Sequence, residues 1–276
     1  GLQQQLGPEH KDTLVVCNDL AVLYEEQKKY DEAEALFRHI LKRGEYCYNF
    51  DHPKVFNVLT SIGILYLKQD RYEEASTLFH QALDSNKKNL GLKHPQTLQT
   101  MHCFGVVYHE QKMYGFAKLL YETILVHRKE VLGEDHVDTI ETTFNLGFVL
   151  LEQGEYSDAE PLLIKVLEYR KDQMGEDDPD TIDAHFRLVD AYVGQKRYLE
   201  AEDLLSYVLK QQELILGEHH NDTMASIYML SGIKMNLERF DEVEQLLTLA
   251  LTRQESIHGK GHPDTLMSLK MLGEFF

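Results

Sequence analysis

Hydrophobic residues recur along this chain with a helical period, in paired segments separated by short polar stretches. The first segment of a pair carries apolar residues three, four and seven positions apart, and the second segment restarts the pattern. One pair consists of Leu59, Ile62, Gly63 and Tyr66, followed by Ala75, Phe79, Ala82 and Leu83. No segment alternates with a period of two over a useful length. The pattern therefore predicts an all-α chain of paired amphipathic helices.

A fixed period of 42 residues runs through the chain without an insertion or deletion. Histidine marks one position of the period, and an aromatic residue followed by a small one marks another. The histidine positions are His10, His52, His94, His136, His220 and His262, with Asp178 in the remaining slot. The aromatic positions are Tyr30, Tyr72, Tyr114, Tyr156, Tyr198 and Phe240. Such a period is the sequence signature of a repeat protein.

Each repeat begins at its histidine position. Proline follows His94 and His262, and proline is favoured at the first helical position. This places each histidine at the N-cap, and Asp178 fills the same slot with one of the best capping side chains. A glycine three residues before the slot and a threonine three residues after it recur in most repeats. Small residues also recur where two helices would approach closely, at Ala21, Gly63, Gly105 and Gly147.

One helix pair cannot bury its apolar stripe alone, whereas pairs stacked in series share a continuous core. We therefore predict a right-handed superhelical solenoid of helix-turn-helix repeats, a single array over residues 1–276. Its repeats begin near residues 10, 52, 94, 136, 178, 220 and 262, and the last one is truncated. Residues 2–7 resemble the end of a second helix at 213–217, so we expect an array excised from a larger protein.

The repeat resembles tetratricopeptide repeats, in particular the 42-residue kind found in kinesin light chains. The resemblance rests on Leu20-Ala21 with Tyr24, on the run from Tyr30 to Phe37, and on the connecting segments 90–95 and 132–136. It covers essentially all 276 residues. The chain departs from the family in two ways: its Trp-type position holds other residues, and the family's groove asparagine is present only as Asn145.

The resemblance implies that the first helices of the repeats line a concave groove that binds a peptide segment of a partner. Outward-facing positions on those helices carry acidic, aromatic and aliphatic side chains, and an apolar strip rimmed by charge is typical of a partner site. The predicted peptide-binding residues are Asn18, Ile64, His102, Val106, Glu141, Phe144, Asn145, Phe148, Phe186, Arg187, Asp190 and Tyr228. The alternative is that some aromatic residues, above all Phe144 and Phe186, pack against the neighbouring repeat.

The charge of the chain is acidic and uneven. The formal net charge is −18, of which residues 1–138 carry −4 and residues 139–276 carry −14. This balance argues against nucleic acid as a partner and favours a basic or apolar peptide over an acidic one. The alternative is a solvated face that keeps a long solenoid in solution. No apolar run is long enough for membrane insertion, and three scattered cysteines fit a cytoplasmic location.

A search for chemistry in the sequence finds no phosphate-binding loop, no H-E-x-x-H and no C-x-x-C motif. His102 and Cys103 are neighbours on one helix and point about 100° apart, which is poor geometry for a thiol–imidazole pair. His219 and His220 with His258 or His262 suggest a metal site, but the 42-residue spacing explains His220 and His262 better as caps. We therefore expect no enzyme, no cofactor and no metal.

Two functions remain open. The first is a non-catalytic scaffold or adaptor that binds a peptide in its groove, similar to a kinesin light chain. The alternative is a ligand-sensing, autoinhibitory repeat domain of a larger signalling NTPase. A phosphate-binding loop upstream would favour the sensor, and an upstream coiled coil would favour the motor adaptor. The sequence does not identify the partner.

Overall fold

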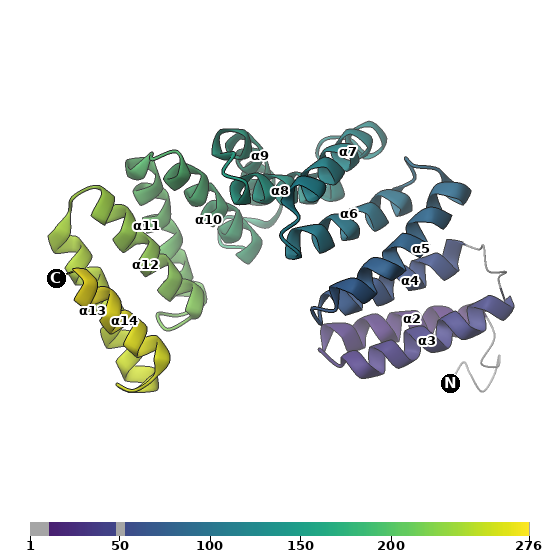
Figure 1. Ribbon diagram of the computed structural model, residues 1–276, viewed down its shortest axis with the longest axis horizontal. Helices are drawn as coiled ribbons and strands as arrows, with labels where there is room; N and C mark the ends of the chain where they lie inside the picture. The colour runs from purple at the N-terminus through teal and green to yellow at the C-terminus, as the bar shows by residue number, and fades with distance from the viewer. Residues whose placement is uncertain (1–10, 48–52, 276) are drawn as a thin grey trace. The chain divides into compact units, whose positions relative to one another are not determined.

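The computed structural model describes the backbone of residues 11–47 and 53–275 and the side chains of residues 16–43 and 57–275 (Figure 1). The described residues form helices joined by short turns, with no strand among them, which confirms the predicted all-α fold. The predicted caps His10 and His52 and the side chain of Cys47 lie outside the described residues.

Helices alternate between the first and the second member of each hairpin. The first helices start just after the histidine position, and the second helices start at the aromatic position, as the period predicts. The first helices are α2 (Lys11–Glu26), α4 (Pro53–Leu67), α6 (Pro95–Glu110), α8 (Val137–Glu152), α10 (Pro179–Gly194), α12 (Asn221–Asn236) and α14 (Pro263–Phe275). The second helices are α3 (Tyr30–Cys47), α5 (Tyr72–Leu90), α7 (Tyr114–Leu132), α9 (Tyr156–Met174), α11 (Tyr198–Ile215) and α13 (Phe240–His258).

Three residues at fixed positions form the junction between successive hairpins: a glycine, an N-cap residue and a threonine. A glycine with φ between 78° and 96° ends the segment, a conformation that other residues rarely adopt. The next N-cap accepts a backbone N–H two residues on, through Nδ1 of His94 or His220 and through Oδ1 of Asp178. A threonine hydroxyl then donates to the glycine carbonyl, as from Thr97 to Gly91 at 2.8 Å. These contacts confirm the predicted caps and explain the recurring glycine and threonine.

The two helices of a hairpin approach closely where the sequence places a small residue. A Cβ added to Gly63 would lie 2.5 Å from a ring carbon of Phe79, and one added to Gly105 would lie 2.6 Å from Tyr121. At Gly147 the nearest carbon of Leu163 would be 3.0 Å away. Contacts below 3.0 Å are not tolerated by packed side chains, so glycine sets the separation of these helices.

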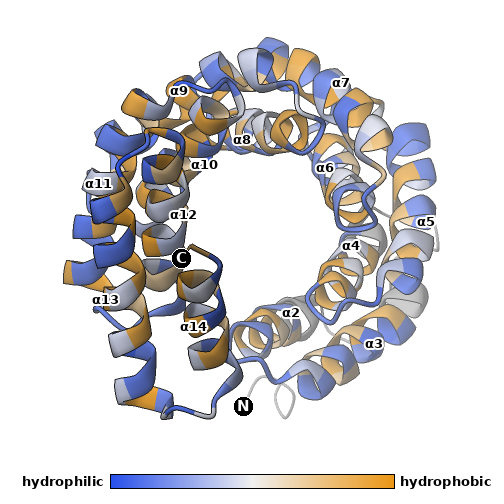
Figure 2. Ribbon diagram, turned by 60° about the vertical axis from the view of Figure 1, so that its left-hand side comes forward, coloured by the Kyte–Doolittle hydropathy of each residue, from blue (hydrophilic) through white to orange (hydrophobic). Residues whose placement is uncertain are grey.

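The contacts divide the chain into two compact units, residues 1–142 and residues 143–276, with the boundary inside α8. In each unit the even-numbered helices lie on one side of the stack and the odd-numbered helices on the other (Figure 2). We call the side made by the even-numbered helices the first-helix face. Phe37, Leu65 and Phe79 are fully buried in the first unit, and Val189 and Leu205 are fully buried in the second.

A polar side chain on a second helix is often hydrogen-bonded to a hydroxyl group 14 residues further on, which belongs to the first helix of the next hairpin. Asn86 donates to Thr100 at 3.1 Å, Arg128 donates to Thr142 at 2.7 Å, and Gln212 accepts from Ser226 at 2.6 Å. The donors and acceptors at these sites are buried, so each bond satisfies groups that water does not reach. Arg170 occupies the same position in another repeat, but Ala184 there offers no hydroxyl.

None of the described helices combines the length and the apolar character that a bilayer span requires.

Candidate functional site

Several predicted peptide-binding residues meet on the first-helix face of the second unit. The guanidinium carbon of Arg187, on α10, lies 4.0 Å from the centre of the Phe148 ring, on α8. Arg187 also lies between two carboxylates of its own helix, with Nε 3.4 Å from Asp183 and Nη1 3.8 Å from Asp190. We call Phe148, Asp183, Phe186, Arg187 and Asp190 the acidic–aromatic cluster. All five side chains are partly exposed, so a ligand can reach them.

The acidic–aromatic cluster carries more negative than positive charge, and burial removes part of the water around its carboxylates. Desolvation by burial is the main reason why the pKa of Asp190 is raised to about 6. Arg187 opposes this rise in part, and the carboxylates of Glu152 and Asp183 add to it. Burial also raises the pKa of Asp183 above its usual value. Asp183 and Asp190 share the Arg187 guanidinium, so an added cation would relieve both the repulsion and the desolvation.

A cavity of about 290 Å³ adjoins the cluster. Its walls combine the start of α10 with the end of α11 and the start of α12. The lining residues are Pro179, Ile182, Asp183, Phe186, Arg187, Gln212, Ile215, Leu216, Asp222 and Ala225. Most of these side chains are apolar, while Asp183 and Arg187 bring charge to its wall. The cavity therefore offers space for an apolar side chain next to a site for a cation.

The structure places the rings of Phe144 and Phe186 in different surroundings. The guanidinium carbon of Arg170 lies 4.2 Å from the centre of the Phe144 ring, while its Nη1 donates to the Asp180 carbonyl at 2.6 Å. Phe144 is therefore half-buried beneath an arginine. Phe186 packs against the core of the second unit and also lines the cavity.

The other predicted residues do not join the cluster. In the first unit Asn18, Ile64 and Val106 are half-buried, Ile64 against the core, and Glu141 is exposed. In the second unit Asn145 is half-buried. The Tyr228 hydroxyl is hydrogen-bonded to Ser268, and its ring lines two further cavities near the end of the chain.

His102 does not belong to the predicted surface. It is 3% exposed, and its ring packs against Tyr121 with centroids 5.4 Å apart. Burial lowers the pKa of His102 to about 3 and raises the pKa of Cys103 to about 12. A neutral, buried imidazole beside a buried thiol has neither the ionisation nor the access that a nucleophilic pair needs. Both side chains are core residues.

Gln212, Ile215 and Leu216 line the cavity from the end of a second helix, and none of them was predicted. The prediction considered first helices only, because the resemblance implies a groove lined by them. The apolar run Leu214-Ile215-Leu216 in the sequence is a signal that could have indicated Ile215 and Leu216. Arg170, which covers the Phe144 ring, was not predicted either, whereas Arg187 was.

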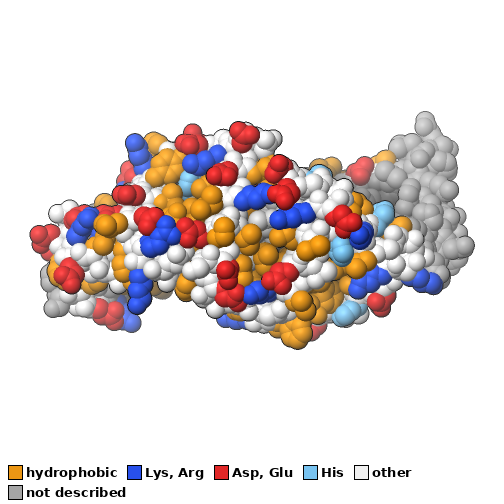
Figure 3. Space-filling view, turned by 90° about the horizontal axis from the view of Figure 1, so that it is seen from above, with side chains coloured by type: hydrophobic (Ala, Val, Ile, Leu, Met, Phe, Trp, Pro, Cys, Tyr) orange, Lys and Arg blue, Asp and Glu red, His pale blue; other side chains and the backbone are white. Residues whose placement is uncertain are grey.

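Lysine and arginine lie interspersed with aspartate and glutamate on the face drawn in Figure 3, and hydrophobic side chains show between them. On the described part of this face, neither sign of charge forms an extended surface.

One family model of the tetratricopeptide repeat matches residues 54–125, 120–172 and 139–213. A second model of the same repeat matches residues 13–54 and 223–264. Together these matches cover more than half of the chain. No curated protein matches it in a sequence comparison.

Solved structures with the same fold come from several kinds of protein. One, described as a kinesin light chain of Podosopora anserina with nearly identical TPR-like repeats, has TM-score 0.65 and 21% identity, covering 75% of this chain and 98% of its own. BtubC of P. vanneervenii has TM-score 0.65 and 18% identity, covering 76% and 84%. A signal transduction ATPase of Pyrococcus horikoshii with a tetratricopeptide repeat sensor has TM-score 0.74 and 11% identity, covering 96% and 39%.

The capped hairpins, their 42-residue period and the family matches agree with one another. The chain belongs to the tetratricopeptide repeat family.

Proposed function

We propose that this chain is a non-catalytic scaffold or adaptor that binds a peptide segment of a partner protein on its first-helix face. The acidic–aromatic cluster and the adjoining cavity form the anchoring site, and the preferred peptide carries a basic residue next to an apolar one. We place this interaction in the cytoplasm, in keeping with the free, buried thiols of Cys17 and Cys103.

The observation that carries the proposal is the surplus of carboxylates around Arg187. A lysine or arginine side chain of a peptide would lie against Asp183 and Asp190 and bring a second positive charge to the two carboxylates that flank Arg187. The face of Phe148 already attracts one guanidinium, so the site also suits cation–π contact. An apolar neighbour in the peptide would fill the cavity of about 290 Å³ and add buried area. An acidic peptide would meet like charge instead.

The proposal is tested with two labelled peptides, one of alternating leucine and arginine and one in which glutamate replaces arginine, by fluorescence polarisation. We expect the basic peptide to bind more tightly and its affinity to fall with added salt. Asp190→Asn should weaken its binding about tenfold, since each tenfold change corresponds to roughly 1.4 kcal/mol. Phe148→Ala should weaken it as well.

The matched control is Asp203→Asn, which changes the net charge by the same amount at an exposed position on α11. It should leave the affinity almost unchanged. If Asp203→Asn and Asp190→Asn weaken binding equally, only the overall charge matters and the cluster is not the site. If the acidic peptide binds as well as the basic one, the proposed preference is wrong.

The second candidate is a sensor domain of a larger signalling NTPase. The observation in its favour is the fold shared with the Pyrococcus horikoshii signal transduction ATPase, over 96% of this chain and 39% of that one. Nucleotide hydrolysis by the full-length protein, stimulated by the ligand of the repeats, would support this alternative. A full-length protein without nucleotide binding would exclude it.

A further inference from the structure

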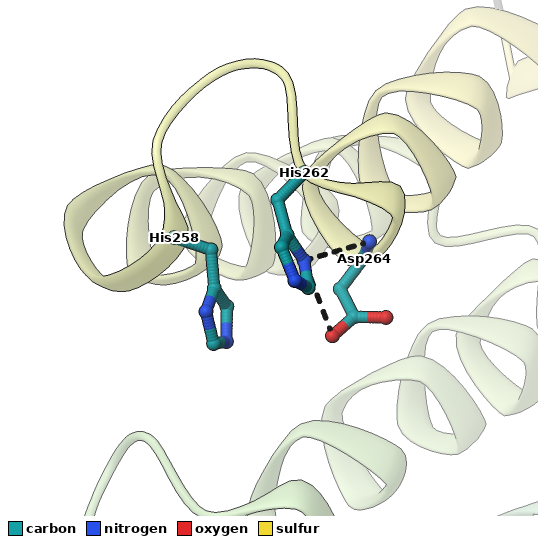
Figure 4. Close-up of side chains that lie close together, drawn as sticks. All are labelled: His258, His262 and Asp264. Carbon is teal, nitrogen blue, oxygen red and sulfur yellow. Dashed lines mark hydrogen bonds and ion pairs between the residues drawn. The ribbon is translucent and has the colours of Figure 1, made fainter.

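The junction between α13 and α14 holds a group of side chains that the capping pattern explains only in part. His258 is the last residue of α13, His262 is the N-cap of α14, and Asp264 lies in the first turn of α14 (Figure 4). One ligand atom from each of the three side chains lies within 4.8 Å of the other two. The two helix ends thus bring two imidazoles and one carboxylate together.

The period of the chain explains His262 but not His258. His94, His136, Asp178 and His220 occupy the capping position at the other described junctions, so His262 has a structural reason to be present. The position of His258 holds an apolar residue at each of those junctions: Leu90, Leu132, Met174 and Leu216. Only here does an imidazole replace the apolar residue, which makes the spacing His-x3-His-x-Asp particular to this junction.

The geometry brings donor atoms near a common point. The rings of His258 and His262 stack with centroids 4.2 Å apart and an angle of 17° between their planes. Nδ1 of His262 lies 3.5 Å from Oδ2 of Asp264. His258 and Asp264 are exposed and His262 is half-exposed, so an ion from solution can reach all three. The segment between the histidines is Gly259-Lys260-Gly261, and its glycines allow the small shifts that coordination requires.

We propose that His258, His262 and Asp264 bind a divalent transition metal ion, with Zn²⁺ as the best match. Two imidazole nitrogens and one carboxylate oxygen are the ligand types that Zn²⁺ accepts, and water would fill the remaining position. On binding, the exposed His258 ring would have to turn out of the stack so that its nitrogen faces the ion. Nδ1 of His262 accepts the Asp264 N–H as the cap, so coordination through this nitrogen transfers that exposed amide to water.

The bound ion would join the end of α13 to the start of α14. Because it binds the folded junction and not the separated helices, it would stabilise the packing of α14 on α13. The site is separate from the acidic–aromatic cluster, so its test does not depend on the proposed peptide binding.

The experiment titrates Zn²⁺ alone into the chain by isothermal calorimetry, with Mg²⁺ as the control ion because it prefers oxygen ligands. His258→Leu is the decisive variant, since leucine already occupies this position at Leu90 and Leu132 and should preserve the fold. Loss of a residue that only supports a ligand costs roughly 10–100-fold in affinity, so loss of a ligand should cost at least tenfold. Asp264→Asn should also weaken binding, and it serves if His258→Leu fails to fold.

A gain-of-function variant gives an independent check. Leu132→His places an imidazole at the end of α7, beside the cap His136 and Asp138, whose Nδ1 and Oδ2 are already 3.9 Å apart. This variant should bind one more Zn²⁺ than the wild-type chain, and thermal unfolding should shift upward with Zn²⁺ in both. Unchanged Zn²⁺ binding in His258→Leu, or equal binding of Mg²⁺ by the wild-type chain, would overturn the proposal.

Discussion

Glycine at the helix crossings allows two helices to pack closely, because it lacks the Cβ that any other residue would carry. Gly105 shows this well, because Tyr121 fills the space that a Cβ would take and is itself fully buried. Such a crossing cannot relax cheaply, since the ring that would have to move is packed on all sides.

Gly105→Ala should therefore destabilise the chain by about 1–3 kcal/mol, the usual cost of overpacking. The control is Gly115→Ala on the neighbouring helix α7, where an added Cβ meets nothing within 4 Å. Alanine there should leave stability unchanged or raise it slightly, because it favours the helix over glycine. Urea denaturation followed by circular dichroism measures both, and equal stabilities would contradict the crossing argument.

Asp190 makes stability depend on pH. Its pKa is raised to about 6 in the folded chain, whereas an unfolded aspartate titrates near pH 4. The folded state therefore holds a proton that the unfolded state has released, so stability falls as pH rises from about 4 to 6. Asp190→Asn should reduce this fall, leaving the part that comes from Asp183, and should stabilise the chain at pH 7 by about 1–2 kcal/mol. Denaturation curves across this pH range, with Asp203→Asn as control, would reveal an unchanged slope if the argument is wrong.

At the scale of the helix, the N-cap decides where each first helix begins. His220 and Asp178 make the same hydrogen bond to the amide two residues on, at 3.2 Å and 2.9 Å. The cap therefore requires an acceptor atom rather than an imidazole in particular.

His220→Asp should keep the stability of the chain or raise it slightly, whereas His220→Ala should cost about 1 kcal/mol. His219→Ala is the neighbouring control, because His219 is exposed and precedes the cap. Thermal unfolding of the three variants compares them directly. A loss in His220→Asp as large as that in His220→Ala would mean that the imidazole itself is needed.

Most of the helical architecture could be predicted from the sequence, because caps, glycines and aromatic positions act locally and repeat. The candidate site could be predicted only in part. His102 shares its periodic position with Phe144, Phe186 and Tyr228, yet it is buried while they are partly exposed. The cavity is lined by Pro179 and Leu216, residues of distant segments that no local pattern brings together. Periodicity thus predicts which residues share a helix face, but not how much of that face the neighbours cover.

At the scale of the whole molecule, each hairpin is stabilised mainly by its neighbours along the chain. In such a system a core defect is expected to loosen nearby repeats and to leave distant ones intact.

Leu205→Ala shortens a core side chain of the second unit and should lower the local free energy of unfolding by about 2–5 kcal/mol. It should therefore reduce the hydrogen-exchange protection of α10, α11 and α12. The protection of α4 and α5 should not change. Leu199→Ala on the same helix is the control, since that side chain is 58% exposed. Exchange measured by mass spectrometry would contradict this expectation if α4 and α5 lost protection to the same extent.

The glycine, cap and threonine at each hairpin junction also bear on how such a chain can evolve. Because most of the described junctions make the same threonine–glycine contact, as between Thr223 and Gly217 or Thr265 and Gly259, a duplicated or deleted block of 42 residues meets compatible ends. Recombination can therefore lengthen or shorten the array without new joining contacts, while point mutations diversify the exposed positions of each block independently.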